Sequence, residues 1–264
     1  MRRTLAACCA ALLSAASAQH AAAEIVTRTV EYTHGDTKLI GYLAYDDAVQ
    51  GKRPGVLVVH EWYGLNDYAK RRARELAALG YVALAADIYG EGKVAANREE
   101  AAALAGRFRG GDGSLLRERT AAGLEALRSQ EEVDPQRLAA IGYCFGGTAV
   151  LELARSGADL DLVVSFHGGL QTAAPASRGD IKATVLVLNG AADPMVPPED
   201  RAAFMKEMDG AGADWQLVEY GGAVHAFTNP DADKAGIPGV AYDEKADRRS
   251  WEAMRSALAE AFAR

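Results

Sequence analysis

The chain lacks an excess of basic residues: 29 Lys and Arg stand against 36 Asp and Glu, a formal net charge of −7. No basic cluster favours nucleic acid or an anionic membrane surface as a partner. The sequence also lacks internal repeats, low-complexity tracts and a Pro- or Ser-rich linker. The chain has 49% hydrophobic and 25% charged residues. This composition, together with the absent features, is typical of a globular protein with one sizeable core.

No apolar run is long enough to span a bilayer, but a shorter one lies at the N-terminus. Residues 1–3 (Met-Arg-Arg) are basic, residues 4–16 are apolar and rich in alanine, and small residues precede two cleavage sites. We therefore predict that residues 1–23 are a signal peptide, cleaved after Ala18 or Ala23, and that residues 24–264 form a single domain. The expected location is periplasmic or secreted, with no stable membrane insertion after the signal is removed.

Cysteine is scarce, with 3 residues in the chain. Cys8 and Cys9 fall in the predicted signal peptide, so Cys144 is the single cysteine expected in the mature protein. It cannot form an internal disulfide, although export would permit one. A lone thiol in an oxidising compartment is a liability unless it is buried or used in chemistry.

The rest of the chain alternates strand-like apolar runs with helical patterns. Residues 26–33 and 38–45 predict a hairpin that turns at 34–36. Further strands are expected at 56–59, 81–86, 138–142, 162–166, 183–188 and 215–220, and helices at 65–79, 97–108, 114–129, 198–208 and 248–262. The pattern predicts an α/β fold: a mostly parallel, doubly wound sheet with helices on both faces and an antiparallel N-terminal hairpin. Ligands bind beyond the carboxyl ends of the strands in such sheets.

A candidate nucleophile stands at one of these strand ends. Gly142 lies two places before Cys144 and Gly146 two places after it, between an apolar run and a helical stretch. This is the pattern of the nucleophile elbow of α/β-hydrolases, with Cys in place of Ser. The strand turns so sharply into the helix that side chains at the flanking positions would clash with backbone. The alternative is a buried cysteine in an ordinary tight turn.

Two partners follow the later strands. Asp193 comes after the strand at 183–188, and His225 comes after the strand at 215–220. An aspartate before proline is also a common turn, and a lone histidine is more often structural. However, nucleophile, acid and histidine in this order are those of α/β-hydrolases. They predict a triad in which His225 takes and returns a proton while Asp193 orients its ring.

A fourth motif, His-Glu-Trp-Tyr-Gly-Leu-Asn at residues 60–66, follows the first central strand. Together with Gly-x-Cys-x-Gly-Gly, Asp-Pro-x-Val-Pro and His-Ala-Phe, it resembles the dienelactone hydrolase family from about Lys38 to the C-terminus. The resemblance implies an α/β-hydrolase fold and a cysteine nucleophile that cleaves small esters or lactones. Because no cluster has metal-ligand spacing and no Gly-rich loop fits a dinucleotide or phosphate, no metal and no cofactor are expected.

The resemblance also implies roles for three further residues. In the family, the carboxylate at the position of Glu61 contacts the resting nucleophile and helps to generate the thiolate when substrate arrives. A helix-capping or turn carboxylate is the alternative. The amides of Trp62 and Phe145 would form the oxyanion hole, and that of Phe145 also stands free at a helix N-terminus.

The shared motifs do not imply that this chain acts on the family's dienelactone substrate. Dienelactone hydrolases hold the substrate carboxylate with arginines, one of them four residues after the catalytic histidine, where this chain has Asn229. The other falls in a region that contains three arginines, none aligned by motif: Arg98, Arg107 and Arg109. Two histidines remain. We expect His60 to pack beside Glu61, and we favour a structural role for His167 over a place in the pocket.

The leading interpretation is an exported, cofactor-independent hydrolase of small esters or lactones that forms a thioester at Cys144. Asn229 keeps a second interpretation open, a non-catalytic small-molecule-binding protein on the same scaffold. A thiol redox protein is disfavoured because the chain has no resolving cysteine and no Cys-x-x-Cys. For the quaternary state, we favour a monomer.

Overall fold

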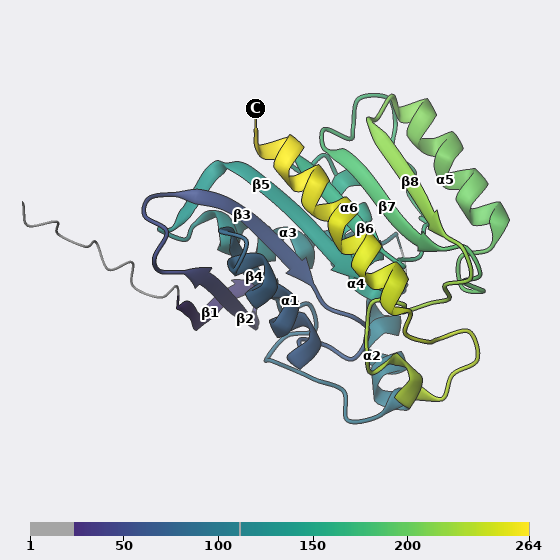
Figure 1. The fold of residues 1–264 in the computed structure, drawn as a ribbon, viewed down its shortest axis with the longest axis horizontal. Coiled ribbons are helices and arrows are strands. Elements are labelled where there is room, and N and C mark those ends of the chain that lie inside the picture. Colours follow the sequence, from purple (N-terminus) through teal and green to yellow (C-terminus); the bar gives the residue numbers. More distant parts are fainter. Residues whose placement is uncertain (1–23, 111, 264) are drawn as a thin grey trace, which may run out of the picture.

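The computed structural model describes residues 24–110 and 112–263, so the predicted signal peptide lies outside the described residues. An eight-stranded sheet has the order β1-β2-β4-β3-β5-β6-β7-β8 (Figure 1). The strands are β1 Ile25–His34, β2 Thr37–Asp46, β3 Arg53–Val59, β4 Val82–Ala86, β5 Val133–Tyr143, β6 Leu162–Phe166, β7 Thr184–Gly190 and β8 Trp215–Tyr220.

The sheet is antiparallel at one edge and parallel elsewhere. β1 and β2 pair along their whole length through a turn in which Gly35 has φ +54°, and β2 also runs antiparallel to β4. All remaining neighbours, from β4 through β3 and β5 to β8, are parallel. The predicted mostly parallel sheet with an antiparallel N-terminal hairpin is confirmed. The carboxyl ends of six strands therefore open at the same edge.

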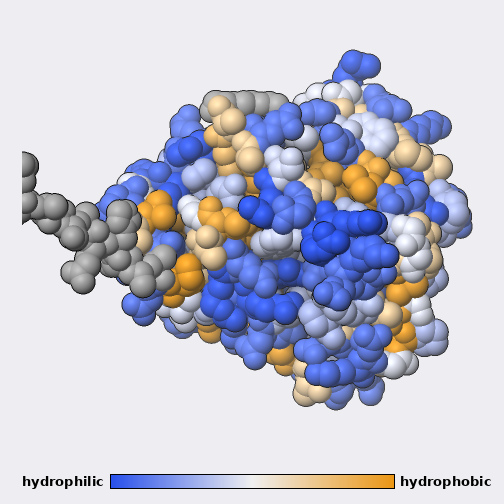
Figure 2. All heavy atoms as spheres, viewed as in Figure 1, coloured by the Kyte–Doolittle hydropathy of each residue, from blue (hydrophilic) through white to orange (hydrophobic). Residues whose placement is uncertain are grey.

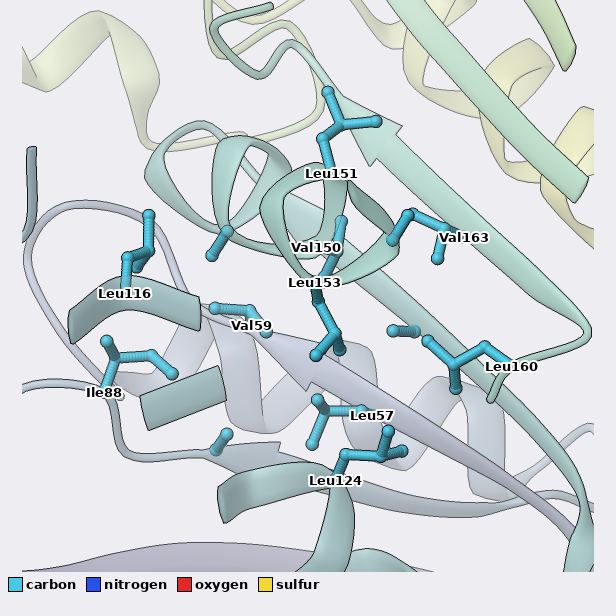
Figure 3. Packing of buried hydrophobic residues seen from close by; sticks show 14 of the residues in the cluster. Leu57, Val59, Ile88, Leu116, Leu124, Val150, Leu151, Leu153, Leu160 and Val163 are labelled. Atoms are coloured by element: carbon cyan, nitrogen blue, oxygen red, sulfur yellow. The ribbon is translucent and has the colours of Figure 1, made fainter. Parts of the chain in front are cut away.

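Helices cover both faces of the sheet (Figure 1). They are α1 Asp67–Ala77, α2 Arg98–Arg109, α3 Ser114–Arg128, α4 Phe145–Arg155, α5 Pro198–Ala211 and α6 Glu244–Phe262. One buried cluster joins the sheet to α3, α4 and α5, and a second joins its other face to α1 and α6. In Figure 3, Leu57 and Val59 of β3 pack against Leu124 of α3 and Leu153 of α4.

α3 and α5 begin at the predicted residues 114 and 198, but α1 and α6 do not, because capping side chains decide where they begin. The carbonyl of the Asn66 side chain accepts hydrogen bonds from the amides of Tyr68 and Ala69, so α1 begins at Asp67 and not at residue 65. Asp243 caps α6 through the amide of Ala246, so this helix begins about one turn before the predicted residue 248. A short 3₁₀ helix at Ala232–Ala235 was not predicted.

The surface is that of a globular protein. On the face viewed in Figure 2, hydrophilic residues predominate and hydrophobic residues form small groups between them. Within residues 24–110 and 112–263, no helix has the length and apolar character needed to cross a membrane.

Candidate active site

Cys144 lies at the turn between β5 and α4 in a strained backbone conformation. Its φ is +53° and its ψ is −112°, values that L-residues adopt at an energetic cost. Both flanking glycines are required sterically. A Cβ at Gly142 would lie 2.0 Å from the carbonyl oxygen of Gly146, and a Cβ at Gly146 would lie 2.2 Å from that of Val59. This is the geometry of a nucleophile elbow.

The three predicted triad residues lie in hydrogen-bond contact. Nε2 of His225 is 3.1 Å from Sγ of Cys144, and Nδ1 of His225 is 2.8 Å from Oδ2 of Asp193. The other carboxylate oxygen of Asp193 accepts from the amide of Met195 at 2.8 Å. Both Asp193 oxygens are thereby engaged, which fixes the carboxylate and, through it, the orientation of the imidazole ring.

The charges around His225 favour its protonated form. Burial alone lowers the pKa of His225, but the charge of Cys144, hydrogen bonds to Asp193 and Cys144, and the charge of Asp193 together raise it to about 10. A protonated His225 would in turn stabilise negative charge that develops beside it, because opposite charges attract.

Glu61 follows β3 and is buried beside the same cavity as Cys144 and His225. Its Oε2 accepts a hydrogen bond from Nδ2 of Asn229 at 2.6 Å. Burial raises the pKa of Glu61, while the Asn229 hydrogen bond and the charges of His225, Arg72 and Arg71 oppose the rise. Asn229, at the position where the sequence suggested a missing arginine, thus gives the carboxylate a neutral amide partner.

The two predicted oxyanion amides lie at the ends of β3 and β5. Phe145 is the first residue of α4, so its N–H has no acceptor inside the helix. Trp62 is held by the hydroxyl of Tyr89, which donates to the Trp62 carbonyl at 2.7 Å. The ring of Tyr89 also packs against those of His60 and Phe145.

A cavity of about 1040 Å³ opens over these residues and is lined by Cys144, His225, Glu61 and Trp62. The structure distinguishes the three arginines that the sequence left open. Arg98 and Arg109, from the two ends of α2, line the cavity, whereas Arg107 is not among its lining residues. Among the described residues, no group of three or more His, Cys, Asp or Glu side chains could hold a metal ion.

His60 is fully buried, and its contacts agree with packing beside Glu61. Nδ1 of His60 donates to the carbonyl of Glu61 at 2.6 Å, and Nε2 accepts from the amide of Ile88 at 3.3 Å. One nitrogen donates and the other accepts, so the ring is neutral. Burial lowers the pKa of His60 to about 4.

His167 is likewise fully buried and does not line the cavity. It contacts Cys144 through the backbone: the amide of Cys144 donates to its Nδ1 at 3.1 Å and also to the carbonyl of Phe166 at 3.0 Å. Its Nε2 lies 2.7 Å from Oγ1 of Thr228. The sequence did not single out Thr228, and the one available signal was its place directly after the His-Ala-Phe motif.

The elbow at the end of β5, with helices on both faces of a mostly parallel sheet, defines an α/β-hydrolase fold. A sequence profile of the dienelactone hydrolase family matches residues 39–262, and the chain belongs to this family. The predicted family and fold are confirmed.

Three relatives illustrate the match. A dienelactone hydrolase-like promiscuous phosphotriesterase from metagenomic libraries is 46% identical with a TM-score of 0.85, covering 89% of this chain and 98% of its own. A "Probable 2-oxo-3-(5-oxofuran-2-ylidene)propanoate lactonase" of Bradyrhizobium sp. is 33% identical over 208 residues, 74% of this chain and 81% of the relative. An uncharacterized protein of Caenorhabditis elegans is 38% identical over 151 residues, 56% of this chain and 95% of the relative.

Proposed function

We propose that this chain is an exported hydrolase that cleaves small esters or lactones through a thioester formed at Cys144. Family membership supports hydrolysis, and one relative bears the name of a lactonase. The observation that carries the mechanism is the chain of contacts from Sγ of Cys144 to His225 at 3.1 Å and from His225 to Asp193 at 2.8 Å.

In the first half-reaction, the Cys144 thiolate attacks the carbonyl carbon of the substrate. The developing oxyanion accepts hydrogen bonds from the amides of Trp62 and Phe145. The C–O bond to the leaving group then breaks, and the proton on Nε2 of His225 passes to the departing alkoxide. Asp193 keeps the ring aligned while its charge changes.

In the second half-reaction, neutral His225 takes a proton from a water molecule, which attacks the thioester carbon. The C–S bond breaks, the carboxylic acid leaves, and the thiolate and imidazolium are restored. No redox partner or cofactor enters this balance. For a lactone, the alcohol and the acid are two ends of one product.

The size of the cavity is consistent with a small ester or lactone as substrate, but its lining does not specify which one. Its volume of about 1040 Å³ reaches the upper end of the range of small-molecule sites. Beside Glu61 it offers the neutral amide of Asn229 in place of a cation. The cationic side chains of its wall come from Arg98, Arg109 and Lys234, and Lys234 is paired with Asp231. We therefore propose the acyl chemistry of the family but not its dienelactone substrate.

Cys144→Ala tests the nucleophile. We expect turnover of an activated nitrophenyl ester to fall by roughly three orders of magnitude or more, because only oxyanion and binding contributions remain. In the wild-type protein, mass spectrometry after incubation with ester or lactone should find an acyl adduct on Cys144. Near-normal turnover by the Ala variant would refute the covalent mechanism.

The same measurements separate the hydrolase from the alternative, a binding protein on this scaffold. Brisk labelling of Cys144 by a small electrophile, blocked by ligand but without hydrolysis across an ester and lactone panel, would favour binding alone. Matching circular dichroism spectra for the wild-type and Ala proteins serve as the control for folding.

Export is tested on the protein isolated from cells. Cleavage after Ala18 or Ala23 gives a mature chain that starts at Gln19 or Glu24, which N-terminal sequencing of a periplasmic or secreted fraction would detect. An intact N-terminus on cytoplasmic protein would contradict the proposal.

A further inference from the structure

His167 follows β6 and is held in an unfavourable backbone conformation. Its φ is +40°, a value that costs a side chain larger than glycine some strain. The residue is fully buried, and its amide donates to the carbonyl of Leu188 at 2.9 Å. Strained residues of this kind persist where the surroundings hold them, and they cluster at functional sites.

The contacts of His167 define its tautomer. A backbone N–H can only donate, so Nδ1 must accept the bond from the Cys144 amide at 3.1 Å. In the neutral ring the hydrogen then lies on Nε2, which donates to Oγ1 of Thr228 at 2.7 Å. Burial and the charge of His225 both lower the pKa of His167 well below its usual value, so Nδ1 stays free to accept.

Thr228 belongs to the segment that carries His225, three residues earlier in the chain. It is anchored from α1 as well, since its Oγ1 lies 2.6 Å from the hydroxyl of Tyr68 and its carbonyl accepts from Nη2 of Arg72 at 2.9 Å. Arg72 is itself paired with Asp247 of α6. The segment after β8 is thus fixed to the body of the protein at Thr228.

We propose that His167 is a positioning residue that sets the spacing between Cys144 and His225, by accepting from the nucleophile's backbone and donating to Thr228. The inference rests on the proposed roles of Cys144 and His225. His167 touches neither the thiol nor the cavity. Its ring meets that of His225 edge-on, with 5.3 Å between centroids, and its hydrogen bonds bridge the elements that carry Cys144 and His225. A shift of about 1 Å between reacting groups lowers rates by about 100-fold, so one lost contact is measurable.

Two substitutions of His167 separate its contacts. In His167→Asn the amide oxygen takes the place of Nδ1 and the bond to Thr228 is lost. In His167→Gln the side-chain amide reaches the place of Nε2, and the Cys144 amide loses its bond to the side chain and keeps only its bond to the Phe166 carbonyl at 3.0 Å. Thr228→Val removes the same contact from the other side without a change of shape, together with the contact to the Tyr68 hydroxyl. Tyr68→Phe removes that second contact alone, and Thr228→Ser is the matched control because it keeps the hydroxyl.

The readouts are ester turnover and the pH profile of Cys144 alkylation without substrate. The groups that face the thiol–imidazole pair are Asp193, Glu61, His167 and the Tyr89 ring. We expect both His167 variants and Thr228→Val to lower kcat by about 10- to 100-fold with little change in KM. Their alkylation profiles should shift to higher pH, because a displaced imidazolium stabilises the thiolate less. Thr228→Ser should keep kcat and the alkylation profile close to those of the wild type.

A merely structural histidine predicts a different result. The variants would then melt at lower temperature, but kcat per folded molecule and the alkylation profile would match the wild type, and that outcome would overturn the proposal. If the His167 variants do not fold, the comparison of Thr228→Val with Thr228→Ser tests the proposal by itself. Equal activity of these two variants would then refute a positioning role for His167. Cys144→Ala tests the proposed function separately. If that function is wrong, Cys144→Ala keeps its ester turnover, whatever the His167 variants do.

Discussion

At the scale of single residues, Glu61 stands out as a buried carboxylate whose hydrogen bond comes from a neutral amide. Asn229 donates to it at 2.6 Å, and burial raises the pKa of Glu61. Cys144 lines the same cavity. A carboxylate charge near a thiol disfavours the thiolate. We therefore propose that Glu61 holds Cys144 as a neutral thiol at rest, the role that the family resemblance implies.

Removing that charge should make the free thiol more reactive. We expect Glu61→Gln to be alkylated by iodoacetamide up to about tenfold faster than the wild type below the pKa of the thiol, since a neighbouring charge shifts a pKa by about one unit. Ester turnover should fall, because activation by substrate is lost. The measurement is the alkylation rate from pH 5 to 9.

Glu61→Asp, which keeps the charge, is the control and should alkylate at the wild-type rate. Asn66, not Glu61, caps α1, so an unchanged profile in Glu61→Gln would point to a carboxylate that only holds Asn229 in place. Such a result would leave Cys144, His225 and Asp193 as a simple triad.

At the scale of elements, the elbow brings β3, β5 and α4 into backbone contact. The first turn of α4 lies so close to β3 that a Cβ at Gly146 would be 2.2 Å from the carbonyl oxygen of Val59. Farther along α4, Val150 and Leu153 join the apolar cluster over β3 (Figure 3). The close approach at Gly146 is what allows the helix to pack while Cys144 stays at the strand end.

Gly146→Ala should therefore separate α4 from β3. We expect a loss of roughly 3 kcal/mol or more in the free energy of unfolding, because the added methyl group overlaps backbone that cannot move alone. Gly106→Ala is the matched control. Gly106 lies in α2, where a Cβ would meet no atom of another element within 4 Å, so alanine should stabilise the protein by about 0.5–1 kcal/mol. Equal urea midpoints for the two variants would contradict this account of the elbow.

At the scale of the whole molecule, two fully buried histidines are held neutral. Burial lowers the pKa of His60 to about 4 and that of His167 well below its usual value. In the unfolded chain both would titrate near 6.5. Between these values the unfolded state binds more protons than the folded state, so folding stability falls as the pH falls.

For His60 alone, the stability present above pH 6.5 should be lost progressively as the pH approaches 4. A difference of about 2.5 units corresponds to about 2–3 kcal/mol between pH 8 and pH 4.5. Urea unfolding at several pH values measures it. His60→Asn, which keeps a donor for the Glu61 carbonyl, should flatten the pH slope. A slope equal to that of the wild type would show that His60 does not contribute.

Most elements follow from local patterns in the sequence. β8 at Trp215–Tyr220 has the predicted bounds, and β4 and α3 differ from the prediction by one residue at most. Apolar periodicity, glycine turns and strand-end motifs act over a few residues, so they are readable without the fold. For the same reason the sequence alone determined the order of Cys144, Asp193 and His225 along the chain and the two glycines that the elbow requires.

Contacts between distant segments were decided only by the tertiary structure. The pairing of Asn229 with Glu61 and the bridge from Cys144 through His167 to Thr228 join segments far apart in sequence. No local pattern encodes them, because they depend on how strands register and how loops after different strands converge. The side of α2 that faces the cavity likewise separates Arg98 and Arg109 from Arg107. Local sequence patterns predict which strand end or helix carries each of these residues, whereas tertiary packing determines which residues they contact.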